Sequence, residues 1–242
     1  MKKITYEIEW KLEKLHWWFI GRRKLIEFLI SCAGTQEDCQ VADIGCGVGS
    51  NLSLLLSMGF EVIGIDSEMY SLSLAKRRLS TISLINGDLL KLPFKTDSLD
   101  LIIATDVLEH LQDDTNGIKE IHRVLKKEGV VVLTVPAFQF LWGVQDEVGK
   151  HHRRYSKKQL IKKIEQEGLG ILKSSYFNFF LFFPILFGRR MIHILGLNID
   201  SENGINTPFI NFILKTIFSI EPFLLKYFSF PFGVSIFCIA KK

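Results

Sequence analysis

The sequence predicts an α/β fold: a doubly wound, mostly parallel sheet of seven strands with helices on both faces. From residue 40 onward, short apolar runs alternate with stretches of helical length, a pattern typical of parallel strands joined by right-handed helical crossovers. The first apolar run also ends in a glycine-rich turn that leads directly into a helical pattern. Helical spacing before the sheet and ahead of its last strand predicts an N-terminal helical cap and a C-terminal helical insertion.

The elements follow in order along the chain. Residues 6–29 have helical apolar spacing, with an interruption expected at residues 21–24. The predicted strands span residues 41–44, 61–66, 82–85, 99–104, 130–135, 171–180 and 233–240. The predicted helices of the sheet are residues 49–58, a polar helix ending at Arg78, residues 118–125 and residues 157–167. Residues 126–129, Lys-Lys-Glu-Gly, fit a cationic last helical turn with a glycine cap.

Length and composition limit the architecture. The 242 residues, 48% of them hydrophobic, suffice for a single domain spanning residues 1–242. We divide it into a helical cap (1–36), a cofactor-binding core (37–137), an acceptor-side loop (138–157) and a C-terminal part (158–242). The last part contains two apolar helices, 184–197 and 209–228, around a polar loop at residues 198–207.

Charge, cysteine content and hydropathy limit the partners, metal sites and location that the sequence predicts. The net charge of +4 is too mild to predict nucleic acid as a partner. The four cysteines form no CxxC pair and have no histidine at metal spacing, which predicts free thiols and no metal. With no signal-peptide pattern and no apolar run of membrane-spanning length, we expect a cytoplasmic protein, with a peripheral membrane contact left open.

The glycine turn, Asp43-x-Gly45-x-Gly47-x-Gly49, carries the main functional signal. A dinucleotide fingerprint requires a glycine at position 50, where this chain has Ser50. A phosphate-binding P-loop ends in Gly-Lys-Ser/Thr, which is absent. A carboxylate two residues ahead of the turn favours a cationic ligand and would repel a pyrophosphate.

Three more acids close the following strands. Asp66 lies about 20 residues after the turn, where a carboxylate can accept both hydroxyls of a ribose. Asp88, with Leu89 beside it, could reach an adenine amino group, although a turn-forming Gly-Asp is the structural alternative. Asp106 closes the next strand. All of them belong to the carboxyl edge, where such sheets bind ligands.

These motifs resemble the class I S-adenosylmethionine-dependent methyltransferases, a Rossmann-like family, and within it the small-molecule type 11/12-like branch. The resemblance rests on residues 43–49, Asp66, residues 86–88 and residues 105–111, Thr-Asp-Val-Leu-Glu-His-Leu. A narrower subset of that family shares residues 16–23 and the run Leu-Trp…Asp-Glu…His-x-Arg-Arg-Tyr at residues 141–155. The resemblance implies S-adenosyl-L-methionine as cofactor. It implies that the following residues bind it: Asp43, Gly45, Cys46, Gly47, Gly49, Asp66, Ser67, Asp88, Leu89 and Asp106.

For the methyl acceptor, the sequence offers several candidate residues, each with an alternative role. Candidate catalytic residues are His110, His151 and Asp106; for His110 the alternative is a solvated or structural role. For His151 and His152 the alternative is pairing with Asp146 or Glu147 within the loop. Arg153 and Arg154 could grip an anionic acceptor such as a phosphate or carboxylate. The alternative is a solvated basic turn that leads into a helix. The candidate substrate contacts are Trp142, His152, Arg153, Arg154, Tyr155 and Trp17.

The apolar region 177–232 has four possible interpretations: an apolar acceptor pocket, a homodimer interface, a membrane-surface patch, or two helices packed on the sheet.

The leading hypothesis is methyl transfer to a small-molecule, glycan or lipid-linked acceptor, at oxygen. Its rivals are a nucleic-acid methyltransferase, a non-catalytic cofactor-binding or membrane-associated partner protein, and a dehydrogenase. The strand ending in Asp106 lacks the Asp/Asn-Pro-Pro-aromatic run of base-methylating enzymes, so nucleic acid is not the expected partner.

Overall fold

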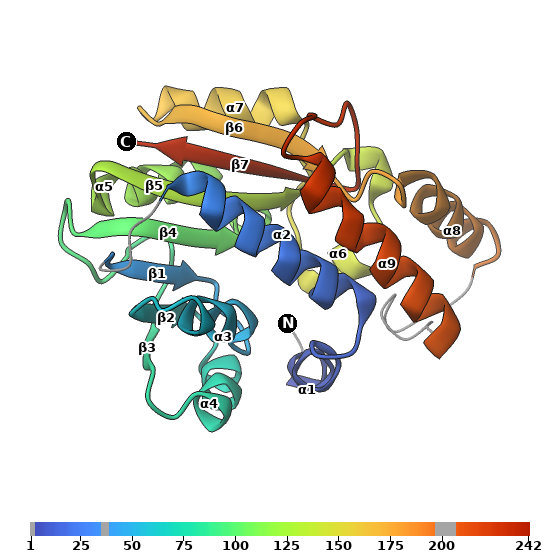
Figure 1. The fold of residues 1–242 in the computed structure, drawn as a ribbon, viewed down its shortest axis with the longest axis horizontal. Helices are drawn as coiled ribbons and strands as arrows, with labels where there is room; N and C mark the ends of the chain where they lie inside the picture. The colour runs from blue at the N-terminus through green and yellow to red at the C-terminus, as the bar shows by residue number, and fades with distance from the viewer. Residues whose placement is uncertain (1–2, 35–38, 197–206) are drawn as a thin grey trace.

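A computed structural model of the chain describes residues 3–34, 39–196 and 207–242. Its centre is a sheet of seven strands in the order β3-β2-β1-β4-β5-β7-β6 (Figure 1). β7 runs antiparallel to both of its neighbours, and the other neighbouring pairs are parallel. The predicted fold class is therefore confirmed. The strands are β1 (Val41–Ile44), β2 (Val62–Asp66), β3 (Ser83–Asn86), β4 (Leu99–Thr105), β5 (Leu125–Pro136), β6 (Gly170–Phe177) and β7 (Ser235–Lys241).

Helices cover both faces of the sheet. On one face lie α2 (Trp17–Ala33), α3 (Ser50–Ser57) and α9 (Pro208–Leu224), with α2 and α9 side by side (Figure 1). On the other face α5 (Asp114–Val124) packs against α7 (Lys157–Gln166). The remaining helices are α1 (Lys3–Leu12), α4 (Met69–Arg78), α6 (Val144–Gly149) and α8 (Phe182–Ile194), with the short 3₁₀ helices η1 (Leu108–His110) and η2 (Gln139–Leu141).

The central strands form the core because their side chains are apolar on both faces. All four residues of β1 are buried, as are the last five of β4 and the last eight of β5. Parallel strands covered by helices on both sides require such continuous apolar runs. The strands therefore stop at polar residues where the sheet ends, and those residues form the site.

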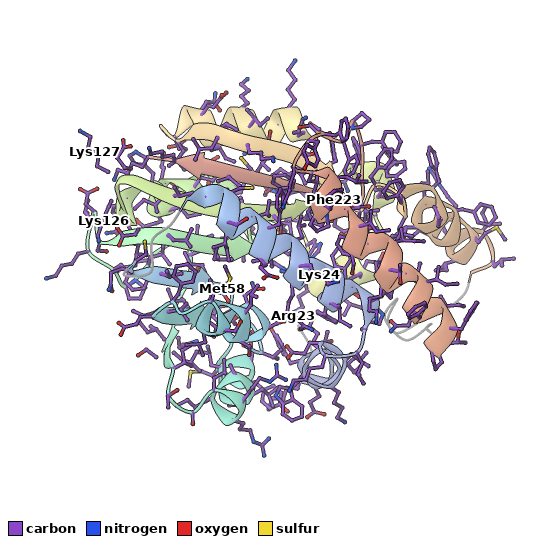
Figure 2. The ribbon with its side chains drawn as sticks, in the orientation of Figure 1. Arg23, Lys24, Met58, Lys126, Lys127 and Phe223 are labelled. Atoms are coloured by element: carbon purple, nitrogen blue, oxygen red, sulfur yellow. The ribbon has the colours of Figure 1, made fainter. Side chains whose placement is uncertain are left out.

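Two local predictions were wrong. The expected interruption at residues 21–24 does not exist, because α2 runs through Gly21 and the break falls between Leu12 and Trp17. Gly21 serves packing instead: a Cβ there would lie 2.3 Å from the ring of Phe218 on α9. Likewise residues 126–129 do not cap a helix. α5 ends at Val124 and these residues belong to β5, with Lys126 and Lys127 near the start of the strand, at the left in Figure 2.

The end of the chain follows the prediction with shifted bounds. β6 stops three residues earlier than expected, and α8 and α9 take the places of the two apolar helices. The predicted acceptor-side loop (138–157) contains η2 and α6. The predicted polar loop at 198–207 lies, except for Thr207, outside the described residues. Within the described ranges, no helix is both long and apolar enough to cross a membrane.

Candidate active site

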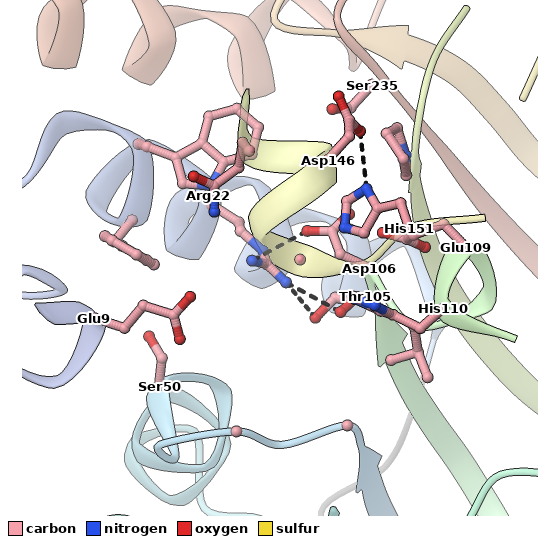
Figure 3. Close-up of a pocket in the computed structure, with 18 of the residues that line it drawn as sticks. Glu9, Arg22, Ser50, Thr105, Asp106, Glu109, His110, Asp146, His151 and Ser235 are labelled. Atoms are coloured by element: carbon pink, nitrogen blue, oxygen red, sulfur yellow. Dashed lines mark hydrogen bonds and ion pairs between the residues drawn. The ribbon is translucent and has the colours of Figure 1, made fainter. Parts of the chain in front are cut away.

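A cavity of about 720 Å³ lies at the carboxyl edge of the parallel strands, beneath the N-terminal helices (Figure 3). Its volume falls within the range of small-molecule sites. The wall is built by the loops after β1, β2, β3 and β4, by α1 and α2, and by residues of α6 and α8. Most of the predicted site residues lie on this wall: Gly45, Cys46, Gly47, Asp66, Ser67, Asp88, Leu89, Asp106, His110, His151, Arg154 and Trp17.

The glycine turn needs its glycines for two different reasons. Gly45 and Gly47 have φ angles of 72° and 53°, in the left-handed region that side chains disfavour. A Cβ at Gly45 would lie 2.4 Å from Val107, whereas one at Gly47 would have no other atom within 4 Å. Gly47 thus leaves bare backbone facing the cavity. Its amide donates to Asp66 Oδ2 at 2.8 Å, so the acid that closes β2 holds the turn in place.

Asp43 lies behind the turn and not on the cavity wall. It is fully buried, and Asn51 links it to the cavity by donating to Asp43 Oδ1 at 3.3 Å and to Thr105 Oγ1 at 2.9 Å. Its other oxygen has no hydrogen-bond partner among the described residues. Burial raises the pKa of Asp43 to about 7. Gly49 is also set back from the cavity wall, as the N-cap of α3 with a φ of 88°.

The other strand-end acids face the cavity. Asp88 and Leu89 form the turn after β3, where Asp88 Oδ1 accepts from the amide of Leu90 at 3.0 Å. Asp66 and Asp106 close β2 and follow β4 on the same wall. α1 adds Glu9, whose pKa burial raises to about 7. This concentration of carboxylates suits a ligand with positive charge.

Arg22 is a site residue that the sequence had marked only as part of a helix interruption and of the 16–23 motif. From α2 it reaches across the cavity, with Nη2 donating to Thr105 Oγ1 at 2.6 Å and Nη1 lying 3.1 Å from Asp106 Oδ2 (Figure 3). Thr134 donates to the other oxygen of Asp106 at 3.1 Å. Asp106 itself has a φ of 56°. The carboxylate is thus held between α2 and β5.

The two candidate histidines meet on the cavity wall. The rings of His110, on η1, and His151, after α6, have centroids 4.6 Å apart and are nearly perpendicular. His151 Nδ1 lies 2.8 Å from Asp146 Oδ1, which confirms the alternative of pairing within the loop while leaving Nε2 unblocked by this contact. Desolvation is the main cause that lowers the pKa of His110 to about 4, so His110 is neutral near pH 7. Glu109 lies next to them, fully buried.

Asp146 anchors this corner of the site. Besides His151, it accepts two bonds from Arg154 Nη1, at 2.9 and 2.7 Å, and one from the amide of Gly143 at 2.8 Å. These interactions outweigh burial and keep the pKa of Asp146 below its ordinary value. Arg154 is 7% exposed and also donates to the carbonyl of Ala137. Arg154 therefore fixes the loop against β5.

Four predicted substrate contacts are not on the cavity wall: Trp142, His152, Arg153 and Tyr155. Arg153 instead pairs with Asp114 at 3.0 Å, and the Tyr155 hydroxyl donates to the same carboxylate at 2.8 Å. His152 is exposed. The expectation that Arg153 grips an acceptor is thus not supported, because the loop turns Arg153 and Tyr155 towards Asp114 on α5. Trp17, by contrast, lines the cavity beside His16.

Comparisons with known proteins agree with this geometry. The model of the methyltransferase domain family, type 11, matches residues 42–133. An uncharacterized methyltransferase of Oceanobacillus iheyensis is 31% identical over 137 residues, covering 56% of this chain and 64% of that protein. A demethylmenaquinone methyltransferase of Staphylococcus epidermidis is 29% identical over 128 residues, covering 48% and 53%. The matches to these curated relatives thus span between about half and two thirds of their lengths.

A solved structure shares the fold over nearly the whole chain. The crystal structure of a SAM-dependent methyltransferase from Archaeoglobus fulgidus superposes with a TM-score of 0.62, covers 98% of this chain and 99% of that one, and is 17% identical. Together with the glycine turn and the carboxylates at the sheet edge, the family match identifies residues 42–133 as a methyltransferase domain of type 11, with S-adenosylmethionine as the methyl donor.

Proposed function

We propose that the protein transfers a methyl group from S-adenosylmethionine to an oxygen atom of an amphiphilic small-molecule or lipid-linked acceptor. The observation that carries this proposal is that one cavity contains both the glycine turn with its acids and the imidazole cluster of His110 and His151. The first can hold a cationic cofactor. The second offers groups that act on the proton of a hydroxyl.

The cofactor side of the cavity fits the group. Gly47 exposes backbone without a side chain, and acids surround the opening. Behind the turn, one buried oxygen of Asp43 has no hydrogen-bond partner among the described residues. Asp66 and Ser67 would hold the ribose, Asp88 and Leu89 the adenine, and the glycine turn the methionine part. When bound, S-adenosylmethionine supplies an electrophilic methyl group: its sulfur–methyl bond breaks as the acceptor oxygen–methyl bond forms, and the sulfur keeps the electron pair.

The acceptor side supplies proton removal and positioning. His151 is held by Asp146 through Nδ1, so its ring is fixed with Nε2 available. An acceptor hydroxyl in the space next to Asp106 would lose its proton at this cluster, with Asp146 orienting the imidazole. The cavity walls would hold the two reactants in line, and such positioning accounts for much of the catalysis of a displacement.

The apolar helices support an amphiphilic acceptor. Ile185 and Ile192 of α8 and Leu214 of α9 line the cavity. A hydrocarbon chain of the acceptor would therefore contact these apolar side chains, on the side of the cavity opposite the glycine turn. The demethylmenaquinone methyltransferase named above is a relative whose acceptor, by its name, is a quinone.

We further propose that α8 and α9 dock on an anionic bilayer surface. Both helices expose large apolar side chains: Phe183, Phe187, Ile194, Phe209, Phe212 and Phe223. In their described residues the one acid, Glu221, is buried, whereas Arg190 and His193 of α8 are exposed. Exposed aromatic side chains beside the Arg190 cation, with no exposed acid on the two helices, complement anionic headgroups.

Two experiments test these proposals. Calorimetry should detect S-adenosylhomocysteine binding at micromolar concentration, and transfer of a labelled methyl group should require a hydroxylated amphiphile. No binding at high micromolar concentration would refute the proposed methyl transfer.

For docking of α8 and α9 on a bilayer, phosphatidylglycerol vesicles should retain the wild type much better than phosphatidylcholine vesicles, and Phe187→Ser should weaken retention. A stable dimer in sedimentation velocity, without vesicle binding, would assign the apolar surface to a second copy instead.

A further inference from the structure

Three side chains on the cavity wall form a group that sequence spacing did not connect. Glu109 and His110 lie on η1, and His151 follows α6, 41 residues further along the chain (Figure 3). One carboxylate oxygen and one nitrogen from each imidazole all lie within 4.8 Å of one another. The sequence predicted no metal site, because it offered no compact motif. The fold brings these three groups together from distant segments.

Glu109 poses a physical problem that the mechanism above leaves unsolved. Its side chain is fully buried, and neither carboxylate oxygen has a hydrogen-bond partner among the described residues. A buried carboxylate without partners is strongly destabilising unless it is protonated or balanced by a cation.

Each of the two histidine rings has a hydrogen-bond partner that fixes its orientation. Metal-binding histidines usually donate their second ring nitrogen to a carboxylate or a backbone carbonyl, which orients the ring. Here Asp146 bonds Nδ1 of His151 at 2.8 Å, and the backbone of Gly149 is a hydrogen-bond partner of His110. Both rings therefore have an outer partner, and one nitrogen of each ring lies within 4.8 Å of a Glu109 carboxylate oxygen.

Gly149 keeps the space between these groups open. A Cβ at this position would lie 2.7 Å from His151 Nε2 and 3.6 Å from His110 Cε1. Since real Cβ atoms do not come so close, any side chain there would push the His151 ring away. The convergence of the three groups thus depends on a glycine whose φ angle is not in the left-handed region.

We propose that Glu109, His110 and His151 bind a divalent cation, and that Zn²⁺ or Mn²⁺ binds in preference to Mg²⁺. Two imidazole nitrogens and one carboxylate oxygen are a donor set for such ions, whereas Mg²⁺ prefers oxygen ligands throughout. Three protein ligands leave at least one coordination position towards the cavity. The inference deepens the proposed function, on which its chemistry rests: a cation in this position lowers the pKa of an acceptor hydroxyl, whose proton then passes to solvent water.

Metal binding itself is the first test. Chelator-treated protein should take up one Zn²⁺ or Mn²⁺ per chain in calorimetry, and Co²⁺ should give visible absorption bands. Glu109→Gln and His151→Ala should each weaken the metal affinity at least 100-fold, and Asp146→Asn about 10- to 100-fold. The matched control is His122→Ala, on α5 away from the cavity, which should bind like the wild type. Circular dichroism shows whether each variant is folded.

The outcomes separate this inference from the proposed function. If Zn²⁺, Mn²⁺ and Co²⁺ all fail to bind at 100 µM, or if Glu109→Gln binds as tightly as the wild type, the metal site is refuted. S-adenosylhomocysteine binding measured on the same metal-free protein then decides the proposed function independently, with His151 acting directly as the base. Metal uptake that disappears in the folded Glu109→Gln variant supports the site whatever the acceptor is.

Discussion

Replacing Phe218 with alanine tests whether α9 belongs to the folded core. Phe218 is fully buried, with ring centroids 5.5 Å from Trp18, 6.0 Å from Trp17 and 6.1 Å from Phe177. Gly21 gives the ring its close approach to α2. Deleting such a ring removes apolar burial and leaves a cavity, at a cost of about 3–5 kcal/mol. For a chain of this size we expect Tm to fall by roughly 6–20 °C.

Phe223 provides the matched control on the same helix. Its side chain is 60% exposed (Figure 2), so Phe223→Ala should change the unfolding free energy by less than about 0.5 kcal/mol. Urea unfolding followed by tryptophan fluorescence measures both variants, since Trp17 and Trp18 surround Phe218. A loss below about 1 kcal/mol for Phe218→Ala, or equal losses for both, would show that α9 is not packed as described.

Three further predictions concern the site and its supports. Asp66→Ala should weaken S-adenosylhomocysteine binding at least tenfold in a calorimetric titration, because the carboxylate both lines the cavity and holds the amide of Gly47, whereas Arg153→Ala, outside the cavity, should bind normally; equal losses would contradict this division. Gly149→Ala should lower methyl transfer without changing cofactor affinity, because its Cβ would displace His151; unchanged turnover would count against a role for that ring. Burial raises the pKa of Glu221 to about 7, so its stabilising contribution is complete below about pH 4.5 and is lost as pH rises through 7. Relative to Glu221→Gln, the wild type should therefore lose about 3 kcal/mol of unfolding free energy between pH 4.5 and 8, and a constant difference in urea unfolding would exclude this role.

The sequence by itself determined the sheet and the cofactor side of the site. Apolar strands that end in polar residues at fixed intervals are a local signal, so Asp66, Asp88 and Asp106 could be assigned to one edge without coordinates. The glycine turn is equally local, because φ angles of 53° and 72° at Gly47 and Gly45 require glycine whatever surrounds them.

Only the tertiary structure decided the acceptor side. Whether Arg153 or Arg154 points inward depends on the path of one loop, and that loop turns Arg153 to Asp114 and Arg154 to Asp146. Arg22 and Gly21 looked like a helix break, because the reason for a glycine there, the ring of Phe218, lies nearly 200 residues away. The meeting of Glu109 with His151 is of the same kind. Contacts between distant segments arise from packing, and no spacing along the chain encodes them.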